Sequence, residues 1–314
     1  MNKKSLEEIA QKMVADGKGI LAADESTGTI KKRFDTIALE STEDNRRDYR
    51  EMLFRSDEAM QSAISGVILY DETIRQKAAD GTTLVNLIER AGSIPGIKVD
   101  AGAKDMAGHP NEKVTEGLDG LRERLEEYFK LGARFAKWRA VINIGDGIPS
   151  RACITANTHA LARYAALCQE NGIVPIVEPE VIMDGPHTVE TCYEVTSSVL
   201  TALYAQLDEQ NVHLEGSILK PNMIVSGTEC PTQASVQQVA EMTLDCFNKC
   251  VPQAVPGIVF LSGGQSDELA TAHLDAMNKM GPHSWKISFS YGRALQAAPL
   301  KTWGGKPENI IAAQ

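Results

Sequence analysis

Short apolar segments alternate with longer amphipathic segments along the whole chain. Eight short segments are rich in β-branched residues and end in polar or glycine-rich residues, which is the pattern of strands buried on both faces. The predicted strands cover residues 19–23, 66–70, 97–100, 133–139, 173–178, 216–220, 257–262 and 285–290.

The segments between these strands carry apolar residues with a period near 3.6, which predicts helices packed on one face. In residues 117–132 the stripe is formed by Leu118, Leu121, Leu125 and Tyr128, and Gly132 supplies a stop. Further helices are predicted for residues 155–172, 188–211 and 235–251.

Eight strands that alternate with helices predict an α/β protein, a single (β/α)8 TIM barrel. No low-complexity segment or Pro/Ser-rich linker interrupts the chain, so we expect one domain over residues 1–314. A doubly wound open sheet is the main alternative. It is disfavoured because no GxGxxG or Walker loop follows the first strand.

Composition narrows the possible partners. The chain has 32 Lys and Arg against 42 Asp and Glu, a formal net charge of −10, and such a balance disfavours binding to nucleic acid or to membrane surfaces. A basic pocket for an anionic substrate remains compatible with it. The apolar runs are too short to span a bilayer, and no apolar signal core follows the N-terminus, so we expect a cytoplasmic protein.

Cysteines and histidines give no sign of a metal site. The six cysteines form no CxxC pair and have no histidine at zinc-ligand spacing, so we expect reduced, mostly buried thiols. The six histidines form no HxH or HExxH motif. We therefore expect no metal.

Ionisable residues interrupt the predicted strands near their carboxyl ends. They are Asp24, Lys98, Lys137, Arg139, Glu178, Glu180 and Lys220, and polar residues follow the last two strands as Ser262-Gly263-Gly264 and Ser290-Tyr291-Gly292-Arg293. A barrel interior is normally apolar, and a buried charge must be paired or serve a purpose. Each residue could singly be a strand end that reaches solvent, but six strands with this pattern predict an active site.

Lysine is the informative residue in this set. Burial and neighbouring cations lower the pKa of a lysine and so favour its neutral amine, which can form a Schiff base with a carbonyl. Lys220 ends an apolar run before Pro221, while Glu178 and Glu180 can divide acid and base duties. The alternative is that Lys220 is only a structural ion-pair partner of one of these carboxylates.

The two glycine-rich loops are typical of phosphate sites in barrels, where backbone N–H groups approach an oxyanion and Arg293 adds a bidentate donor. Similar loops also occur without ligands. Arg33, Lys98 and Arg139 could hold a second phosphate, which strengthens the interpretation.

Long motifs make the sequence resemble the class I fructose-1,6-bisphosphate aldolases, which form a Schiff base and use no metal. The resemblance extends over essentially the whole chain. Its motifs are GILAADESTG at 19–28, TEDNRR at 42–47, GIKVD at 96–100, FAKWR at 135–139, IVPIVEPE at 173–180, LEGSILKPN at 214–222, FLSGGQ at 260–265, FSYGR at 289–293 and WGGK at 303–306.

The resemblance implies reversible cleavage of fructose 1,6-bisphosphate to dihydroxyacetone phosphate and glyceraldehyde 3-phosphate in glycolysis and gluconeogenesis, without a cofactor. Lys220 matches the Schiff-base lysine, and Glu178 matches the group that takes the C4 hydroxyl proton. Asp24, Lys137 and Glu180 match residues that position the substrate and assist proton transfer. Matches to one phosphate site are Ser262, Gly263, Gly264, Ser290, Gly292 and Arg293, and matches to the other end of the substrate are Ser26, Thr29, Arg33, Lys98 and Arg139.

The family also implies a homotetramer. Animal members continue to a tail whose terminal tyrosine helps proton exchange at C3; because the sequence given ends at Gln314, we expect another group or water to serve that step, or turnover to be limited there. Two alternatives remain, a Schiff-base aldolase for another sugar phosphate and a non-catalytic scaffold. Two phosphate sites favour a bisphosphate, and a scaffold would be expected to lose Lys220 or Glu178.

Overall fold

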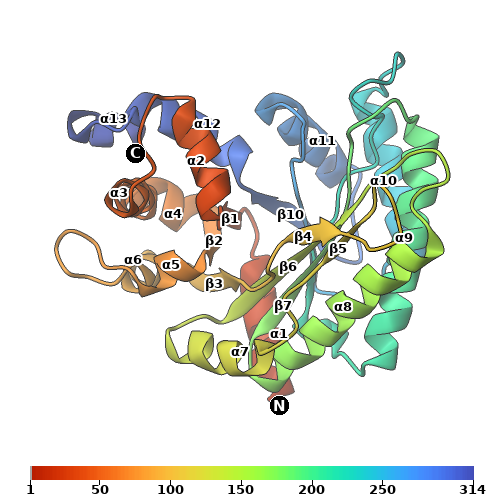
Figure 1. The fold of residues 1–314 in the computed structure, drawn as a ribbon, viewed down its shortest axis with the longest axis horizontal. Helices are drawn as coiled ribbons and strands as arrows, with labels where there is room; N and C mark the ends of the chain where they lie inside the picture. Colours follow the sequence, from red (N-terminus) through yellow and green to blue (C-terminus); the bar gives the residue numbers. More distant parts are fainter. Residues whose placement is uncertain (1) are drawn as a thin grey trace.

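Eight parallel strands close into a barrel surrounded by helices in the computed structural model, which describes residues 2–314 (Figure 1). Around the barrel the strands follow the order β1-β10-β9-β8-β7-β6-β3-β2. The predicted (β/α)8 TIM barrel is therefore confirmed, and the open doubly wound sheet is wrong. The barrel strands are β1 Gly19–Ala23, β2 Ile64–Leu69, β3 Ile94–Lys98, β6 Phe135–Ile142, β7 Val174–Val181, β8 Ile218–Leu219, β9 Gly257–Phe260 and β10 Lys286–Tyr291.

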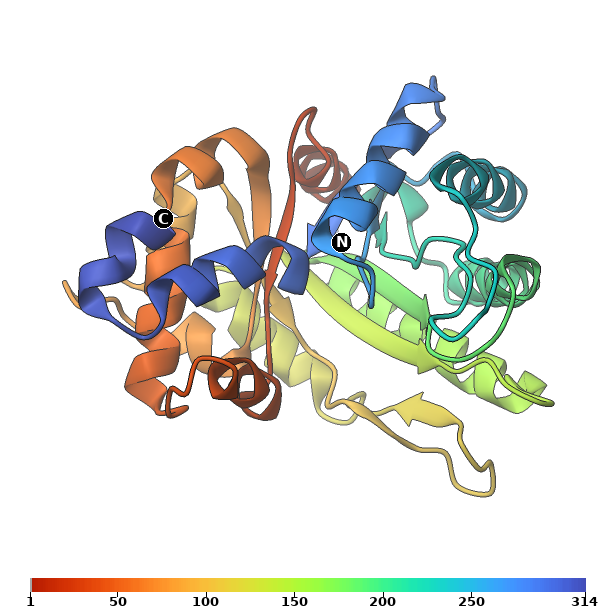
Figure 2. The same cartoon turned by 90° about the horizontal axis from the view of Figure 1, so that it is seen from above.

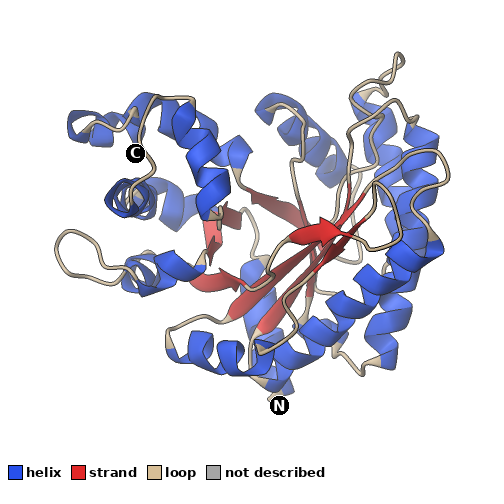
Figure 3. Ribbon diagram, viewed as in Figure 1, coloured by secondary structure: helices blue, strands red, loops and turns tan. Residues whose placement is uncertain are grey.

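Helices cover the outside of the barrel, as the colouring by secondary structure shows (Figure 3). The α-helices are α1 Lys3–Met13, α2 Thr27–Asp35, α3 Glu43–Phe54, α4 Asp57–Ala63, α5 Asp71–Arg75, α6 Leu84–Arg90, α7 Leu121–Lys130, α8 Arg151–Glu170, α9 Val189–Glu209, α10 Val236–Cys250, α11 Asp267–Lys279, α12 Arg293–Trp303 and α13 Ile310–Ala313. Two short 3₁₀ helices cover Leu214–Gly216 and Pro307–Asn309.

All eight predicted strands are present, and their boundaries differ for physical reasons. β6 and β7 run on to Ile142 and Val181, past the charged residues that were taken to end them. β8 has only two residues, because Pro221 lacks an N–H for the ladder. Lys220 still donates its N–H to the carbonyl oxygen of Val177, at 2.9 Å, and so stays aligned with β7.

A β-hairpin outside the barrel is absent from the prediction. Strands β4 (Ala103–Asp105) and β5 (Lys113–Thr115) form an antiparallel hairpin that projects from the barrel (Figure 2). Its strands have three residues each, and all of β4 is exposed, so no run of buried residues marks it in the sequence.

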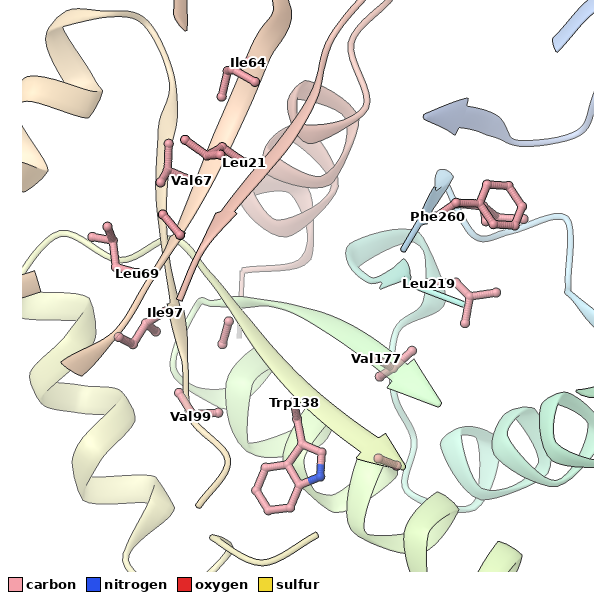
Figure 4. Close-up of a cluster of buried hydrophobic side chains, with 14 of the residues drawn as sticks. Leu21, Ile64, Val67, Leu69, Ile97, Val99, Trp138, Val177, Leu219 and Phe260 are labelled. Atoms are coloured by element: carbon pink, nitrogen blue, oxygen red, sulfur yellow. The ribbon is translucent and has the colours of Figure 1, made fainter. Parts of the chain in front are cut away.

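The outward faces of the barrel strands pack against the helices. Leu21, Val67, Ile97 and Leu219 belong to this layer and are buried (Figure 4). Trp138 on β6 packs against Tyr164 of α8, with ring centroids 5.6 Å apart. This layer fixes the rotation of each strand and thereby decides which residues face the barrel interior.

The interior is apolar near the amino ends of the strands. Phe135 fills the space left by Gly66 and Gly96, where a Cβ would come within 2.9 and 2.3 Å of its ring. On the outer side of the barrel, Phe289 packs in the same way against Gly19. Helix α1 packs Leu6 and other buried residues into the same apolar cluster. The amino end of the barrel is thus filled with side chains.

The structure also bears on the expected thiols and on membrane spans. All six cysteines are free; Cys250 is partly exposed and the other five are buried. Within residues 2–314, no helix combines the length and the apolar character needed to cross a membrane.

Candidate active site

Inward-facing positions become charged towards the carboxyl ends of the strands. Lys137 and Arg139 face the interior above Phe135, because alternate residues of a strand point to the same side. Strand register places Lys98 opposite Lys137 and Arg139 opposite Glu178. The staggered register of a tilted barrel therefore brings residues from distant parts of the chain to one end.

Four of the predicted residues form a continuous buried ionic cluster. The Lys137 ammonium lies 2.7 Å from a carboxylate oxygen of Asp24 and 3.4 Å from Oε2 of Glu178. Lys220 Nζ lies 3.2 Å from the other Glu178 oxygen. Lys137, Glu178 and Lys220 have only 4%, 2% and 5% of their surface exposed. Glu178 is thus shared by the two lysines.

The cluster keeps two of its members ionised. Burial opposes ionisation of Asp24, but the positive charges of Lys137 and Lys220 outweigh it and lower the pKa of Asp24 to about 2. Burial likewise opposes the charge on Lys137, but Asp24 and Glu178 outweigh it and raise the pKa of this lysine. Lys137 is therefore held as an ammonium ion beside Lys220.

Glu180 lies apart from this cluster. Its carboxylate forms an ion pair with the Arg139 guanidinium and, within residues 2–314, none with a lysine. The two carboxylates of β7, which were predicted together as an acid and base pair, thus have different environments. Of these two carboxylates, only Glu178 contacts the lysines.

The cations predicted for a second phosphate are also paired. Arg33 lies 2.6 Å from Glu25, and Lys98 lies 3.0 Å from Asp100. Neither carboxylate was singled out from the sequence, although Asp100 is two residues beyond Lys98 and Glu25 directly follows Asp24. The spacing of two between Lys98 and Asp100 places both side chains on one face of an extended segment, and this was the signal in the sequence that could have identified Asp100.

Helix α2 begins at the same end of the barrel. Ser26 is its N-cap and accepts a hydrogen bond from the Thr29 N–H at 3.4 Å, and the two hydroxyl oxygens are 3.1 Å apart. The helix dipole and both hydroxyls therefore lie at the cavity that Arg33 also lines.

The loops after β9 and β10 form the adjoining part of the cavity wall, because β10 pairs with β1. Arg293 donates to the carbonyl oxygens of Gly263, at 3.3 Å, and of Gln265, so its guanidinium holds the neighbouring loop. The Gly264 N–H donates to the sulfur of Met183 at 3.0 Å, and Gly264 does not line the cavity. Buried Ser290 Oγ has no hydrogen-bond partner within residues 2–314.

These residues enclose a cavity of 430 Å³ at the carboxyl end of the barrel. Every predicted site residue lines it except Gly264 and Glu178, which is buried between the two lysines. Across residues 2–314, no group of three or more His, Cys, Asp or Glu side chains is arranged to hold a metal ion. The arrangement offers three amines, several carboxylates and a wall of backbone and hydroxyl donors.

Comparison with known proteins gives a consistent result. A family model described as fructose-bisphosphate aldolase class-I matches residues 5–314. A probable fructose-bisphosphate aldolase class 1 of Xanthomonas campestris pv. campestris is 62% identical over 96% of this chain and 90% of its own length. Fructose-bisphosphate aldolase 1 of Toxoplasma gondii is 54% identical over 99% of this chain and 86% of its own.

A solved structure extends the similarity to the fold. Fructose-bisphosphate aldolase of Plasmodium falciparum, solved with TRAP and a small-molecule inhibitor, superimposes with a TM-score of 0.96 at 50% identity. The match covers 99% of this chain and 90% of that one.

Proposed function

The chain belongs to the class I fructose-bisphosphate aldolase family, and from this premise we propose that it cleaves fructose 1,6-bisphosphate through a Schiff base on Lys220. As a fructose-bisphosphate aldolase, it is a carbon–carbon lyase. The observation that carries the proposed mechanism is the position of Lys220, which lines the cavity 3.2 Å from Glu178.

The first step joins the enzyme to the ketone. The Lys220 nitrogen, after loss of a proton to Glu178, bonds to C2 of the open-chain substrate. The C2 oxygen leaves as water with two protons that began on the lysine ammonium, and one N–H proton stays on the resulting iminium. Glu178 suits the proton transfers because its oxygens face both lysines, at 3.2 and 3.4 Å.

The second step breaks the C3–C4 bond. Glu178 takes the proton of the C4 hydroxyl, the C4–O electrons close the aldehyde, and the bond pair moves to form C2=C3 while the iminium nitrogen accepts its electrons. The products are glyceraldehyde 3-phosphate and an enamine on Lys220. Protonation at C3 and hydrolysis then release dihydroxyacetone phosphate and restore the amine.

The neighbouring residues supply orientation and charge. Lys137, kept positive by Asp24 and Glu178, can donate to substrate oxygens without competing as a nucleophile. One phosphate is assigned to the wall of Ser262, Gly263, Ser290, Gly292 and Arg293.

The other end of the substrate is assigned to a second group of lining residues, Ser26, Thr29, Arg33, Lys98 and Arg139. Glu180 acts there by holding Arg139. Gly264 joins the first phosphate site only if its N–H leaves the sulfur of Met183. Two phosphate walls in one cavity support a bisphosphate substrate.

Several broader properties belong to the same proposal. We propose metal-independent catalysis, a place in glycolysis and gluconeogenesis, a single domain, cytoplasmic location and a homotetramer. The family supports these assignments, and the free cysteines fit a reducing compartment. Sedimentation of the purified protein would test the tetramer.

A cleavage assay tests the mechanism as a whole. We expect cleavage of fructose 1,6-bisphosphate to be unchanged by EDTA. We also expect borohydride to abolish activity irreversibly when dihydroxyacetone phosphate is present, and to have little effect without it. Activity that EDTA removes, or that survives borohydride with dihydroxyacetone phosphate, would contradict the proposal.

A further inference from the structure

The loop proposed to bind phosphate is fastened from beneath by two buried polar side chains. Gln265, 4% exposed, donates from Nε2 to the carbonyl oxygen of Ser262 at 3.1 Å. His273 of α11, 2% exposed, lies with Nδ1 2.6 Å from Oε1 of the same glutamine. Neither residue lines the cavity.

Pinning the Ser262 carbonyl decides the direction of the next N–H group. In a trans peptide the C=O and N–H bonds point to opposite sides. Because the Ser262 oxygen is held towards buried Gln265, the Gly263 N–H points away from it, and Gly263 lines the cavity. This N–H donates to no backbone carbonyl within residues 2–314.

Glycine permits this conformation. Gly263 has φ +56°, in the left-handed region, and Arg293 holds its carbonyl oxygen at 3.3 Å. The loop is therefore held by the guanidinium on its carbonyl oxygens and by Gln265 underneath. The Ser262 carbonyl oxygen also accepts the backbone N–H of Gln265 at 3.2 Å, so the side-chain amide supplies the second of two bonds that hold the Ser262–Gly263 peptide.

His273 sets the orientation of the glutamine. Since the amide nitrogen of Gln265 donates to Ser262, its oxygen must accept, and the proton on the histidine ring must be on Nδ1. A flipped amide would place two carbonyl oxygens against each other and leave the histidine donor facing an N–H. Burial also lowers the pKa of His273, so the ring stays neutral.

We propose that Gln265 and His273 are positioning residues that aim the Gly263 N–H at a substrate phosphate and so set the affinity of the site. The inference rests on the proposed function of the Ser262–Gly263 loop. It assigns to a buried pair, outside the cavity, part of the preference for phosphorylated substrates. Because phosphate binding contributes equally to the bound substrate and the transition state, KM should respond and kcat should not.

The test compares variants in the full-length enzyme. Gln265→Leu removes the side-chain hydrogen bonds to Ser262 and His273, His273→Phe removes only the one to Gln265, and both keep an apolar core of similar size. We expect each to raise KM for fructose 1,6-bisphosphate about tenfold, with kcat within about twofold of the wild type, since a bond to a charged group is lost. Half-saturation by dihydroxyacetone phosphate in borohydride trapping should shift in the same direction.

Two further variants separate positioning from simple packing. His273→Gln keeps a side-chain N–H donor and should restore much of the lost affinity. Met277→Leu changes another buried residue of α11 that makes no such contact, and should leave KM unchanged. The double variant Gln265→Leu/His273→Phe should cost little more than either single change, because the two residues act as one unit.

The outcomes distinguish the two proposals. A wild-type enzyme that does not cleave the bisphosphate overturns the proposed function. An active wild type whose folded Gln265→Leu and His273→Phe variants keep the wild-type KM overturns only this inference. Equal loss of kcat in both variants and in Met277→Leu, with lowered thermal midpoints, would show a purely structural role and overturn it as well.

Discussion

The two ends of the barrel differ in the chemistry of their cavities, and volume alone does not show this difference. The groove at the amino end has a volume of 970 Å³, against 430 Å³ for the cavity at the carboxyl end. Yet two of its buried polar side chains are already paired: Trp285 donates to the carbonyl oxygen of Pro252 at 3.0 Å, and Ser288 to that of Lys18 at 2.6 Å. Its ion pair, Asp16 with Lys286, is exposed.

The smaller cavity instead contains buried charges, whose desolvation must be offset by pairing. The inward side of β6 shows the change, with Phe135 at the amino end and Lys137 two residues later. Apolar packing at the amino end of the barrel thus stabilises the fold, whereas burying the charged groups at the carboxyl end costs free energy. Buried charged groups, more than cavity volume, therefore distinguish the candidate active site from the groove.

Among substitutions at the two ends of the barrel, we expect the largest effect on activity at Lys220. Lys220→Met should lower kcat by about 10⁴-fold or more, because the electron sink is lost. The thermal midpoint should change little, because Lys137 still neutralises Glu178. Steady-state kinetics and thermal unfolding of the same sample measure both quantities. An active Lys220→Met enzyme would remove the basis of the contrast.

The opposite profile is expected at the amino end. Gly96→Ala places a methyl group 2.3 Å from the ring of Phe135, which should cost about 1–3 kcal/mol of unfolding free energy. The kcat of the folded fraction should stay within about twofold. Gly28→Ala is the matched control, because its Cβ would meet no atom within 4 Å. Equal destabilisation by the two substitutions would contradict the packing argument.

A pH-dependent effect is expected at Asp24. Its folded pKa of about 2 lies below the usual 3.8, so its ionisation stabilises the fold above about pH 4. That contribution, roughly 2 kcal/mol, should be lost as the pH falls from about 4 to 2. Asp24→Asn should therefore show a flatter dependence of unfolding free energy on pH, measured by urea denaturation. Parallel curves for the two proteins would show that Asp24 is not held ionised by the lysines.

The smallest effect tests the large groove. Trp285→Phe removes the hydrogen bond to Pro252 and should cost about 1 kcal/mol of unfolding free energy. KM and kcat should both stay at the wild-type values. A change in either kinetic constant would mean that the amino-end groove takes part in catalysis.

Much of this architecture could be predicted from the sequence. Periodicity predicted eight strands that alternate with helices, and Lys220 and Glu178 stood out as candidate site residues because a charge at an inward strand position is rare. The pairing of Glu180 with Arg139 rather than with a lysine depends on side-chain reach across staggered strands. A pattern along one chain does not contain that information.

Loop contacts were the least predictable part. The hydrogen bond from Gly264 to Met183 joins residues 81 positions apart, and neither residue type indicates it. His273 belongs to no motif in the sequence, and its contact with Gln265 follows only from the packing of α11 under the loop. Contacts of this kind depend on tertiary structure rather than on local pattern.

Lys220 is the proposed nucleophile, and borohydride trapping with dihydroxyacetone phosphate, followed by peptide mass spectrometry, tests this assignment directly. We predict one reduced adduct, on Lys220, and none on Lys137, which Asp24 and Glu178 keep protonated. An adduct on Lys137 or Lys98 would keep the Schiff-base chemistry and contradict the assigned roles. No adduct on folded, active protein would contradict the mechanism itself.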